Sequence, residues 1–383
     1  MRTQLTGLFL TILLCFSGTT YAYATQEAAA ELSLSCASAI LMEKETGTIL
    51  YDMSSHERLP PASVTKIMTL LLVMEAIDAG RIGANDMVTI SSYAAGMGGS
   101  QVYLKEGEQL SVHELIKCVA VVSGNDCAVA LAEYLSGSET AFVSQMNQRA
   151  AELGMKDTTF LNCTGLPASG HVTSAYDIAL MSRELILNHP SIRQYTTIWM
   201  DSIRDGAFGL TNTNRLIRFY SGATGLKTGS TDSALYCMSA TAERDGMELI
   251  AVIMKAPTTA QRFEDAKTLL DYGFSAYALK EVYPDTPLPP VHVRLGQIAQ
   301  VQPQLQRACR ILVDKGDVNS ISTKLDLTPD VQAPVEQNQI LGSLQIYVGD
   351  ELRDTIPILA AQSVPRLTTG AIFTRFMQRL MAQ

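Results

Sequence analysis

Apolar residues alternate with polar ones over Ser38–Met53, on both sides of Glu45-Thr46-Gly47, and this pattern predicts a β-hairpin. Pro60-Pro61 then interrupts the chain. From Ser63 to Ala76 the apolar residues are dense enough and the run long enough to predict a helix. The chain is therefore expected to start its folded part with a strand pair and a long apolar helix.

Two more helical stretches fill Val112–Leu135 and flank Ser123-Gly124-Asn125-Asp126. A polar break in the middle of apolar helix predicts a loop that rigid elements hold on both sides. The residues Leu226–Lys255 favour strands joined by a turn at Arg244-Asp245-Gly246. Further helices are expected over 140–153, 174–187 and 261–272.

The composition changes near Pro284. From there to Gln362 short alternating segments are separated by Gly, Asp and Pro, which predicts a small all-β domain. The sequence shows no internal repeat. We therefore expect a leader over 1–24, a large mixed domain of helices and strands over 25–282, a β-rich domain over 283–363 and a terminal helix over 364–383.

The first 24 residues have the layout of a secretory signal peptide. Arg2 gives a positive start, Leu5–Phe16 is apolar and uncharged, and Ala22-Tyr23-Ala24 fits an A-x-A cleavage pattern. The apolar run is short for a bilayer span, so an uncleaved anchor is the weaker alternative. The protein is expected to work outside the cytoplasmic membrane.

The last segment, Arg366–Gln383, predicts an amphipathic helix. Its apolar residues share one side and its arginines lie opposite, with no acidic residue among them. Such a helix can lie in the headgroup region of a membrane without spanning it. The alternative is a helix docked on its own domain. The residues on the two sides are Ile372, Phe373, Phe376, Met377 and Leu380 against Arg375 and Arg379.

Composition and charge narrow the class of protein. The chain has 383 residues, of which 47% are apolar and 17% charged, and this excludes a disordered or collagen-like protein. Its net charge of −9 argues against nucleic acid as a partner. The cysteines beyond the leader form no C-x-x-C pair, so neither a zinc site nor a disulfide scaffold is indicated. We expect no metal and no cofactor.

The first candidate for chemistry is Ser63-Val64-Thr65-Lys66. Positions i and i+3 share a helix face, so the Lys66 amine can approach the Ser63 hydroxyl. Burial at the positive end of a helix disfavours a charged lysine, which would make Lys66 a base near neutral pH. A serine hydroxyl needs such a base to become a nucleophile. By itself, S-x-x-K is also what an ordinary helix start looks like.

Two further motifs follow in the chain. Ser123-Gly124-Asn125 places a hydroxyl and an amide on the loop between helices, where they can relay a proton and hold a carbonyl. Lys227-Thr228-Gly229 enters a strand, where an ammonium and a hydroxyl suit a carboxylate and the glycine lets a ligand lie against the strand. Separately, the two motifs are a helix cap and a turn. The series S-x-x-K, S-x-N, K-T-G in this order is the signature of penicillin-recognising serine enzymes.

Within that superfamily the sequence resembles the D-alanyl-D-alanine carboxypeptidases, the low-molecular-mass penicillin-binding proteins of the DacF and DacA kind. The resemblance covers most of the chain from Ser38 onward. It implies an α+β fold: a transpeptidase-like domain with an antiparallel sheet between helical regions, then the small β domain and the amphipathic tail. The segments that carry it are PASVTKIMT (61–69), SGNDCAVALAE (123–133), GMKDTTFLNCTGL (154–166) and GLKTGSTDSA (225–234).

The resemblance also implies roles for the motif residues. Ser63 would attack the carbonyl between the last two D-alanines of a peptidoglycan stem peptide, and Lys66 would accept its proton. Ser123, aided by Asn125, would pass a proton to the departing amine. Water would then hydrolyse the acyl-enzyme. Penicillin and other β-lactams would acylate the same serine more durably.

For substrate binding, the resemblance points to the third motif and the residue after it. Lys227 and Thr228, with Gly229 beside them, would hold the terminal carboxylate. The oxyanion would rest on the backbone N–H groups of Ser63 and Ser230, an arrangement that usually supplies the largest electrostatic contribution. Arg262 aligns with a basic residue that supports carboxylate binding in some relatives. A surface salt bridge is the alternative for this arginine.

Two other functions remain open from the sequence. Glu184-Leu185-Ile186-Leu187-Asn188 resembles the deacylation motif of class A β-lactamases, but it lies inside a predicted helix, and Glu184 is expected on the surface of that helix. A non-catalytic penicillin-binding sensor or scaffold is the second alternative. The favoured hypothesis is an exported carboxypeptidase attached to the outer face of the cytoplasmic membrane by its terminal helix.

Overall fold

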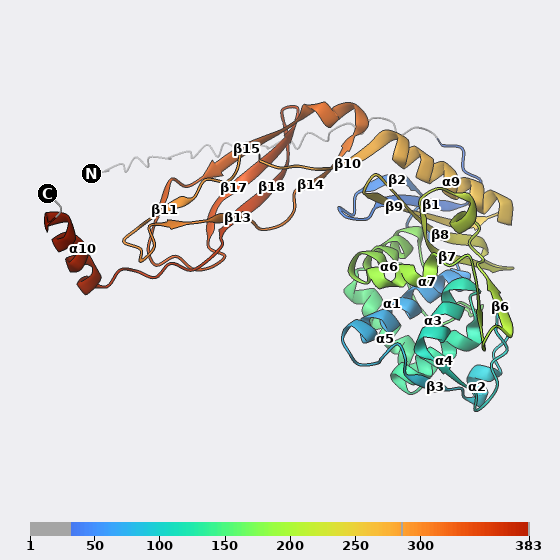
Figure 1. The fold of residues 1–383 in the computed structure, drawn as a ribbon. Helices are drawn as coiled ribbons and strands as arrows, with labels where there is room; N and C mark the ends of the chain where they lie inside the picture. The colour runs from blue at the N-terminus through green and yellow to red at the C-terminus, as the bar shows by residue number, and fades with distance from the viewer. Residues whose placement is uncertain (1–31, 285, 382–383) are drawn as a thin grey trace, which may run out of the picture. The chain divides into compact units, whose positions relative to one another are not determined.

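The computed structural model describes residues 32–284 and 286–381 (Figure 1). The predicted leader over 1–24 lies outside these residues. Among them, helices and strands alternate as the sequence predicts, and the mixed fold class is confirmed. No helix of the described part is long and apolar enough to cross a membrane.

The part of the chain before Tyr277 is built on a five-stranded antiparallel sheet. The central strand of this sheet, β9 (Met247–Ala256), is buried along nearly its whole length. The reason is that α9 (Thr259–Ala276) packs on one face of the sheet and α6 (Ala175–Asn188) on the other (Figure 1). A strand covered on both faces carries continuous apolar residues. The order across the sheet is β2 (Ile49–Met53), β1 (Ser38–Glu43), β9 (Met247–Ala256), β8 (Leu235–Arg244) and β7 (Ala223–Thr231).

A group of helices lies on the α6 side of the sheet (Figure 1). Its core is α1 (Lys66–Asp78), whose residues are nearly all buried because they are apolar all round. It begins after a 3-10 turn, η1 (Ala62–Thr65), so the predicted helix starts slightly later than Ser63. The other elements of this region are α2 (Ser92–Ala95), α3 (Val112–Val121), α4 (Asn125–Ser136), α5 (Glu139–Glu152), η2 (Pro190–Ile192), α7 (Arg193–Thr196), α8 (Leu216–Phe219) and the strand pairs β3 (Met87–Thr89) with β4 (Gln109–Ser111) and β5 (Met200–Ile203) with β6 (Phe208–Thr211).

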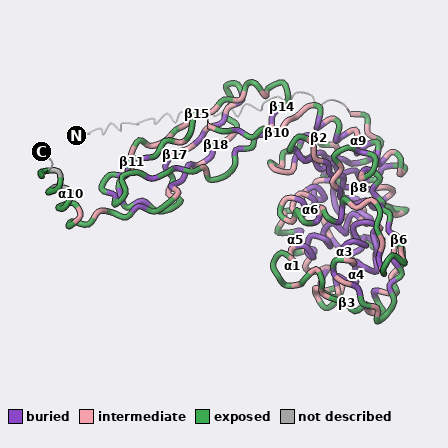
Figure 2. The backbone as a smooth tube through the Cα atoms, viewed as in Figure 1, coloured by how far each residue is buried: buried purple, intermediate pink, exposed green. Residues whose placement is uncertain are grey.

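The residues after α9 form small sheets. The largest has the order β13-β18-β17-β15, a second has β12-β11-β16, and β10 pairs with β14. Burial alternates along β17, as the period of a strand on a core requires (Figure 2). The strands are β10 (Tyr277–Glu281), β11 (Val291–Arg294), β12 (Gln300–Val301), β13 (Pro303–Leu305), β14 (Arg310–Asp314), β15 (Ile321–Leu327), β16 (Asp330–Gln332), β17 (Ile340–Val348) and β18 (Glu351–Ala360), with the 3-10 helix η3 (Lys315–Ser320).

The terminal helix α10 spans Thr369–Met381. Its apolar residues Ile372, Phe373, Met377 and Leu380 are all exposed. The side chains of the other residues in the predicted pattern, Arg375, Phe376 and Arg379, lie outside what the structure describes. The six cysteines of the described part are buried and unbridged.

Candidate active site

Ser63 and Lys66 lie together at the start of the buried helix. Ser63 belongs to η1 and Lys66 is the first residue of α1. The Lys66 Nζ lies 3.0 Å from the Ser63 Oγ, which is hydrogen-bond distance. The spacing of three residues thus brings the two groups together across the 3-10 turn, as it was predicted to do within a helix.

Lys66 is fully buried and contacts two carbonyl oxygens. Its Nζ donates to the Asn125 Oδ1 and to the Thr164 backbone oxygen, each at 2.6 Å. Desolvation by burial lowers the pKa of Lys66 to about 7. A neutral amine has two N–H groups, and these two oxygens engage both. The remaining lone pair is then left for the Ser63 hydroxyl, so the arrangement allows Lys66 to accept a proton.

Ser123 occupies the short loop between α3 and α4 in a strained conformation, with a φ of +65°. Its Oγ is buried and has no hydrogen-bond partner in the structure. A buried hydroxyl without a hydrogen-bond partner lowers the stability of the folded protein. Buried polar groups of this kind occur mainly at functional sites. Ser123 therefore has a free hydroxyl to offer to a ligand.

Asn125 is the first residue of α4 rather than a loop residue. Besides accepting from Lys66, its side chain donates from Nδ2 to the Gly98 oxygen at 2.6 Å. The next residue, Asp126, is buried, and its Oδ2 accepts from the backbone N–H groups of Val102 and Leu104. Asp126 thus ties the 98–104 segment to the start of α4. Sequence reasoning missed this role, although the acid follows the S-x-N motif directly.

The third motif lies on β7, the edge strand of the sheet. A Cβ added to Gly229 would lie 2.8 Å from the Ser63 nitrogen, so the strand passes close to Ser63 only because glycine stands there. Thr228 is buried and donates from Oγ1 to the Thr213 Oγ1 at 2.8 Å. Ser230, the next residue along β7, is exposed. The structure thus brings the K-T-G strand to Ser63.

Lys227 is buried, and its Nζ donates to the Thr228 backbone oxygen at 2.8 Å. Desolvation lowers the pKa of Lys227 well below its usual value, and the positive charges of Lys66 and Arg262 lower it further. An anionic ligand would relieve both effects. This part of the site therefore suits a carboxylate.

Arg262 lies in the first turns of α9 and is buried. Its Nη1 donates to the backbone oxygens of Gly229 and Cys237 at 3.2 and 3.4 Å. Its guanidinium also lies over the rings of Tyr236 and Phe263, and burial lowers its pKa to about 10. The alternative of a surface salt bridge is wrong. The guanidinium instead holds the β7 backbone at Gly229, and a direct part in carboxylate binding stays a prediction.

His171 is buried and hydrogen-bonded through both ring nitrogens. Its Nε2 lies 2.9 Å from the Thr65 Oγ1, and its Nδ1 accepts from the Leu161 N–H at 3.0 Å. Burial lowers the pKa of His171 to about 4, so the imidazole is neutral at pH 7. The two hydrogen bonds of His171 join η1 to the 161–171 loop.

Glu184 lies on α6, as predicted, and is partly buried. Its carboxylate accepts from Arg149 at 2.6 Å, and the same guanidinium donates to Glu75 at 2.8 Å. Ligand atoms of Glu75, Glu184 and His189 lie within 4.8 Å of one another, but the Arg149 cation already compensates both carboxylates. The Glu184 contacts are those of an ion pair between helices, not of a water-activating group beside Ser63.

Comparison with known proteins identifies relatives over nearly the whole chain. Residues 24–258 match the family model described as D-alanyl-D-alanine carboxypeptidase, and residues 278–366 match that of the penicillin-binding protein 5 C-terminal domain. The D-alanyl-D-alanine carboxypeptidase DacF of Bacillus subtilis is 40% identical over 375 residues, which cover 97% of this chain and 95% of the relative.

Solved structures show the same fold. Penicillin-binding protein 5 from Haemophilus influenzae superposes with a TM-score of 0.75 at 28% identity, over 88% of this chain and 99% of that one. Penicillin-binding protein D2 from Listeria monocytogenes, crystallised in the ampicillin-bound form, superposes with a TM-score of 0.59 at 34% identity, over 63% of this chain and 99% of that one.

Proposed function

Because the chain belongs to the D-alanyl-D-alanine carboxypeptidase family, we propose that it is a serine-type hydrolase that removes the terminal D-alanine from peptidoglycan stem peptides. The observation that carries the mechanism is the Lys66 amine. It is buried, both of its N–H groups have carbonyl partners, and its Nζ lies 3.0 Å from the Ser63 Oγ. A base with a pKa near the working pH is the one that catalyses proton transfer best.

In the proposed reaction, Ser63 Oγ bonds to the carbonyl carbon of the penultimate D-alanine while its proton passes to Lys66. The C–N bond to the terminal D-alanine then breaks. Ser123, whose hydroxyl has no other partner, relays a proton to the departing amine, and Asn125 positions the substrate carbonyl. Water hydrolyses the resulting ester and frees Ser63.

The substrate's terminal carboxylate would bind Lys227 and Thr228, where buried positive charge lacks an anion. Gly229 allows the substrate's scissile carbonyl to reach Ser63 along β7. The backbone N–H groups of Ser63 and Ser230 would stabilise the oxyanion. Arg262 would support this binding from behind the strand.

β-Lactams would acylate Ser63 because they mimic the D-Ala-D-Ala terminus; the Listeria relative has been crystallised with ampicillin and with cefotaxime. The alternatives are a β-lactamase and a non-catalytic penicillin-binding sensor or scaffold. The ion pair between Glu184 and Arg149 argues against the β-lactamase, because it engages the glutamate that would have to activate water.

The deciding experiment combines the intact mass after incubation with penicillin G and the release of D-alanine from an N-acylated Lys-D-Ala-D-Ala peptide. We expect a single long-lived adduct together with D-alanine release. Ser63→Ala should lose both and keep its fold by circular dichroism. Residual release in this variant would refute the serine mechanism. Rapid turnover of the antibiotic without an adduct would indicate a β-lactamase, and an adduct without D-alanine release a sensor or scaffold.

We also propose that the protein is exported by its leader and held at the outer face of the cytoplasmic membrane by α10. The exposed apolar residues of that helix support this, because a helix with an apolar face can lie in the headgroup region. We propose the same division of the chain as the sequence predicts, with boundaries after residues 24, 282 and 363.

A further inference from the structure

Thr213 contacts the third motif and the helix that leads into the second. Its backbone N–H donates to the oxygen of Val121, the last residue of α3, at 3.1 Å. Its Oγ1 accepts from the Thr228 Oγ1 at 2.8 Å. Thr213 itself is exposed, whereas Thr228 is buried. One exposed residue of the 212–215 loop thus joins the end of α3 to the K-T-G strand, although it belongs to neither motif.

The loop that carries Thr213 is fixed by two buried asparagines, one on each side of this residue. The Asn212 Nδ2 donates to the Ile198 oxygen at 2.7 Å, and its Oδ1 accepts from the Asn214 N–H at 2.8 Å. The Asn214 Nδ2 donates to the oxygen of Gly225 on β7 at 2.8 Å. Buried polar networks whose groups are satisfied make the local structure rigid. The backbone of Thr213 is therefore held at a fixed place beside β7, and its β-branched side chain has few rotamers.

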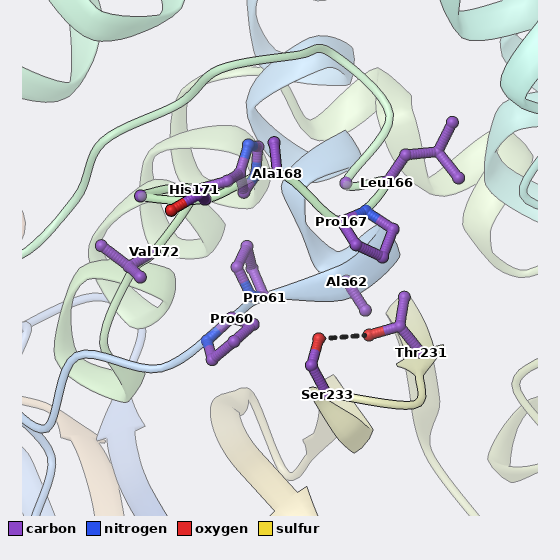
Figure 3. Close-up of a pocket in the computed structure, with 13 residues that line it drawn as sticks. Pro60, Pro61, Ala62, Leu166, Pro167, Ala168, His171, Val172, Thr231 and Ser233 are labelled. Atoms are coloured by element: carbon purple, nitrogen blue, oxygen red, sulfur yellow. Dashed lines mark hydrogen bonds between the residues drawn. The ribbon is translucent and has the colours of Figure 1, made fainter.

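The contact of Thr213 with Thr228 lies outside the pocket beside Ser63. That pocket has a volume of about 410 Å³ and is lined by residues of three segments, among them 60–62, 165–172, Thr231 and Ser233 (Figure 3). Thr228 stands three residues before Thr231 on the same strand, outside this lining. The place where the carboxylate is proposed to bind is therefore distinct from the pocket, and Thr213 lies at that place.

Positive charge gathers around Thr228. Lys227 precedes it in the chain, and Arg262 donates to the backbone of the residue that follows it. Burial lowers the pKa of Arg262 to about 10, and the charge of Arg215, two residues after Thr213, lowers it further. The loop of Thr213 thus borders the part of the site that suits an anion.

The hydrogen bond between the two threonines can run in either direction. A threonine hydroxyl has one proton to donate and two lone pairs with which to accept. In the structure, Thr228 donates its proton to Thr213. A carboxylate only accepts, so it would take this proton, and the Thr228 Oγ1 could then accept from the Thr213 hydroxyl. Hydrogen bonds in such a chain strengthen one another, and those to a charged acceptor are the strongest.

We propose that Thr213 is a positioning residue for the carboxylate of the substrate: its hydroxyl keeps the Thr228 hydroxyl oriented in the free enzyme and donates to it once the carboxylate is bound. The inference rests on the proposed function, because that function places the terminal carboxylate at Lys227 and Thr228. Penicillin G also has a carboxylate, so its acylation of Ser63 depends on the same contact. Thr213 acts through Thr228 and touches no reacting atom.

The first test removes the Thr213 hydroxyl and restores it. Thr213→Val keeps the shape of the side chain. We expect it to lower kcat/KM for D-alanine release from Nα,Nε-diacetyl-Lys-D-Ala-D-Ala, and the rate of acylation by penicillin G, on the order of ten-fold. Thr213→Ser restores the hydroxyl and should recover most of the loss. Thr211→Val, which removes an exposed hydroxyl from β6 two residues earlier, is the matched control and should leave both rates unchanged.

The second test asks whether Thr213 acts through Thr228. Two residues that work through one contact have non-additive effects in a double-mutant cycle. In a Thr228→Val enzyme, Thr213→Val should therefore change the rate of acylation by about two-fold or less. Penicillin G at high concentration and long incubation keep the slow acylation of both enzymes measurable by intact mass.

The outcomes separate this inference from the proposed function. Wild-type rates in Thr213→Val, equal losses in the Ser and Val variants, or the same loss from Thr213→Val in the Thr228→Val enzyme as in the wild type would each overturn the role of Thr213 while the carboxypeptidase activity stands. A wild-type enzyme that releases no D-alanine would overturn the proposed function instead. The free energy of unfolding, measured with urea, shows whether a lower rate comes from lost structure, and Thr213→Ala replaces the Val variant in that case.

Discussion

Gly165 lies so close to Ala62 that a Cβ added to the glycine would be 1.8 Å from the Ala62 carbonyl oxygen. Gly165 also has a φ of +82°, and Ala62 one of +48°. The two residues thus form a tight contact between the 165–172 loop and the turn that carries Ser63. The position of Ser63 therefore depends on the absence of a side chain at Gly165.

We therefore expect Gly165→Ala to displace the Ser63 turn and to slow acylation by penicillin by more than ten-fold. Its free energy of unfolding should fall by at least about 3 kcal/mol, because the overlap adds to the cost of the positive φ. Gly154→Ala is the matched control, since Gly154 has a φ of +75° and nothing within 4 Å of its added Cβ. That variant should lose only about 1–2 kcal/mol and acylate normally. Equal effects in both variants would contradict the contact.

The pKa of Lys66 predicts the pH dependence of acylation. In the proposed mechanism the neutral amine is the base, so the rate should fall about ten-fold per pH unit below a limb near 7. Asn125→Asp places a carboxylate 2.6 Å from the amine and should move the limb upward by about 1–3 units, because an opposite charge stabilises the ammonium. Asn125→Ala removes the contact without adding charge and should not move it upward. The test is the rate of acylation, measured by intact mass between about pH 5 and 9. If the pH limb of the Asn125→Asp variant did not move, this would argue against Lys66 as the base.

His171 predicts a loss of stability in mild acid. The pKa of His171 is lowered to about 4 in the folded state, below its unfolded value, so the neutral form is the stable one in the protein. Its contribution is present in full above about pH 6.5 and declines as the pH falls towards 4. Between pH 7 and pH 5 we expect a loss of about 2 kcal/mol from this group, measured by urea unfolding. The His171→Gln variant should lose less stability than the wild type between pH 7 and pH 5, because it lacks the contribution of the imidazole. The same pH dependence of the free energy of unfolding in both proteins would refute the assignment of this loss to His171.

The proposed membrane attachment depends on the apolar side of α10. Deletion of 369–383 should move the protein from the membrane fraction to the soluble one. Phe373→Glu should do so in part, since Phe373 is 64% exposed and would be buried among lipids. Tyr283→Glu is the matched control, because Tyr283 is equally exposed, at 67%, outside the helix. Sedimentation of the deletion variant with membranes would exclude α10 as the anchor.

The sequence alone determined the local features of this protein. The period of the hydrophobic residues predicts where the strands and helices lie, because an element that buries one face or its whole surface has apolar residues at the corresponding positions. The three-residue spacing from Ser63 to Lys66 brings their side chains together whether the turn is an α-helix or a 3-10 helix. The order of the three motifs was sufficient to indicate the superfamily of penicillin-recognising serine enzymes, and the longer segments around the motifs indicated the family.

Tertiary structure alone decided the contacts between segments far apart in the chain. The Thr164 oxygen on Lys66, the burial that lowers the pKa of this lysine and the Gly165–Ala62 contact all require the 161–172 loop to fold against η1. The sequence contained no signal strong enough to exclude a surface salt bridge for Arg262. The burial of Arg262 depends on the packing of α9 against β8 and β7, which no local pattern shows. Desolvation and close approach are properties of the packed molecule, and no local pattern of residues encodes them.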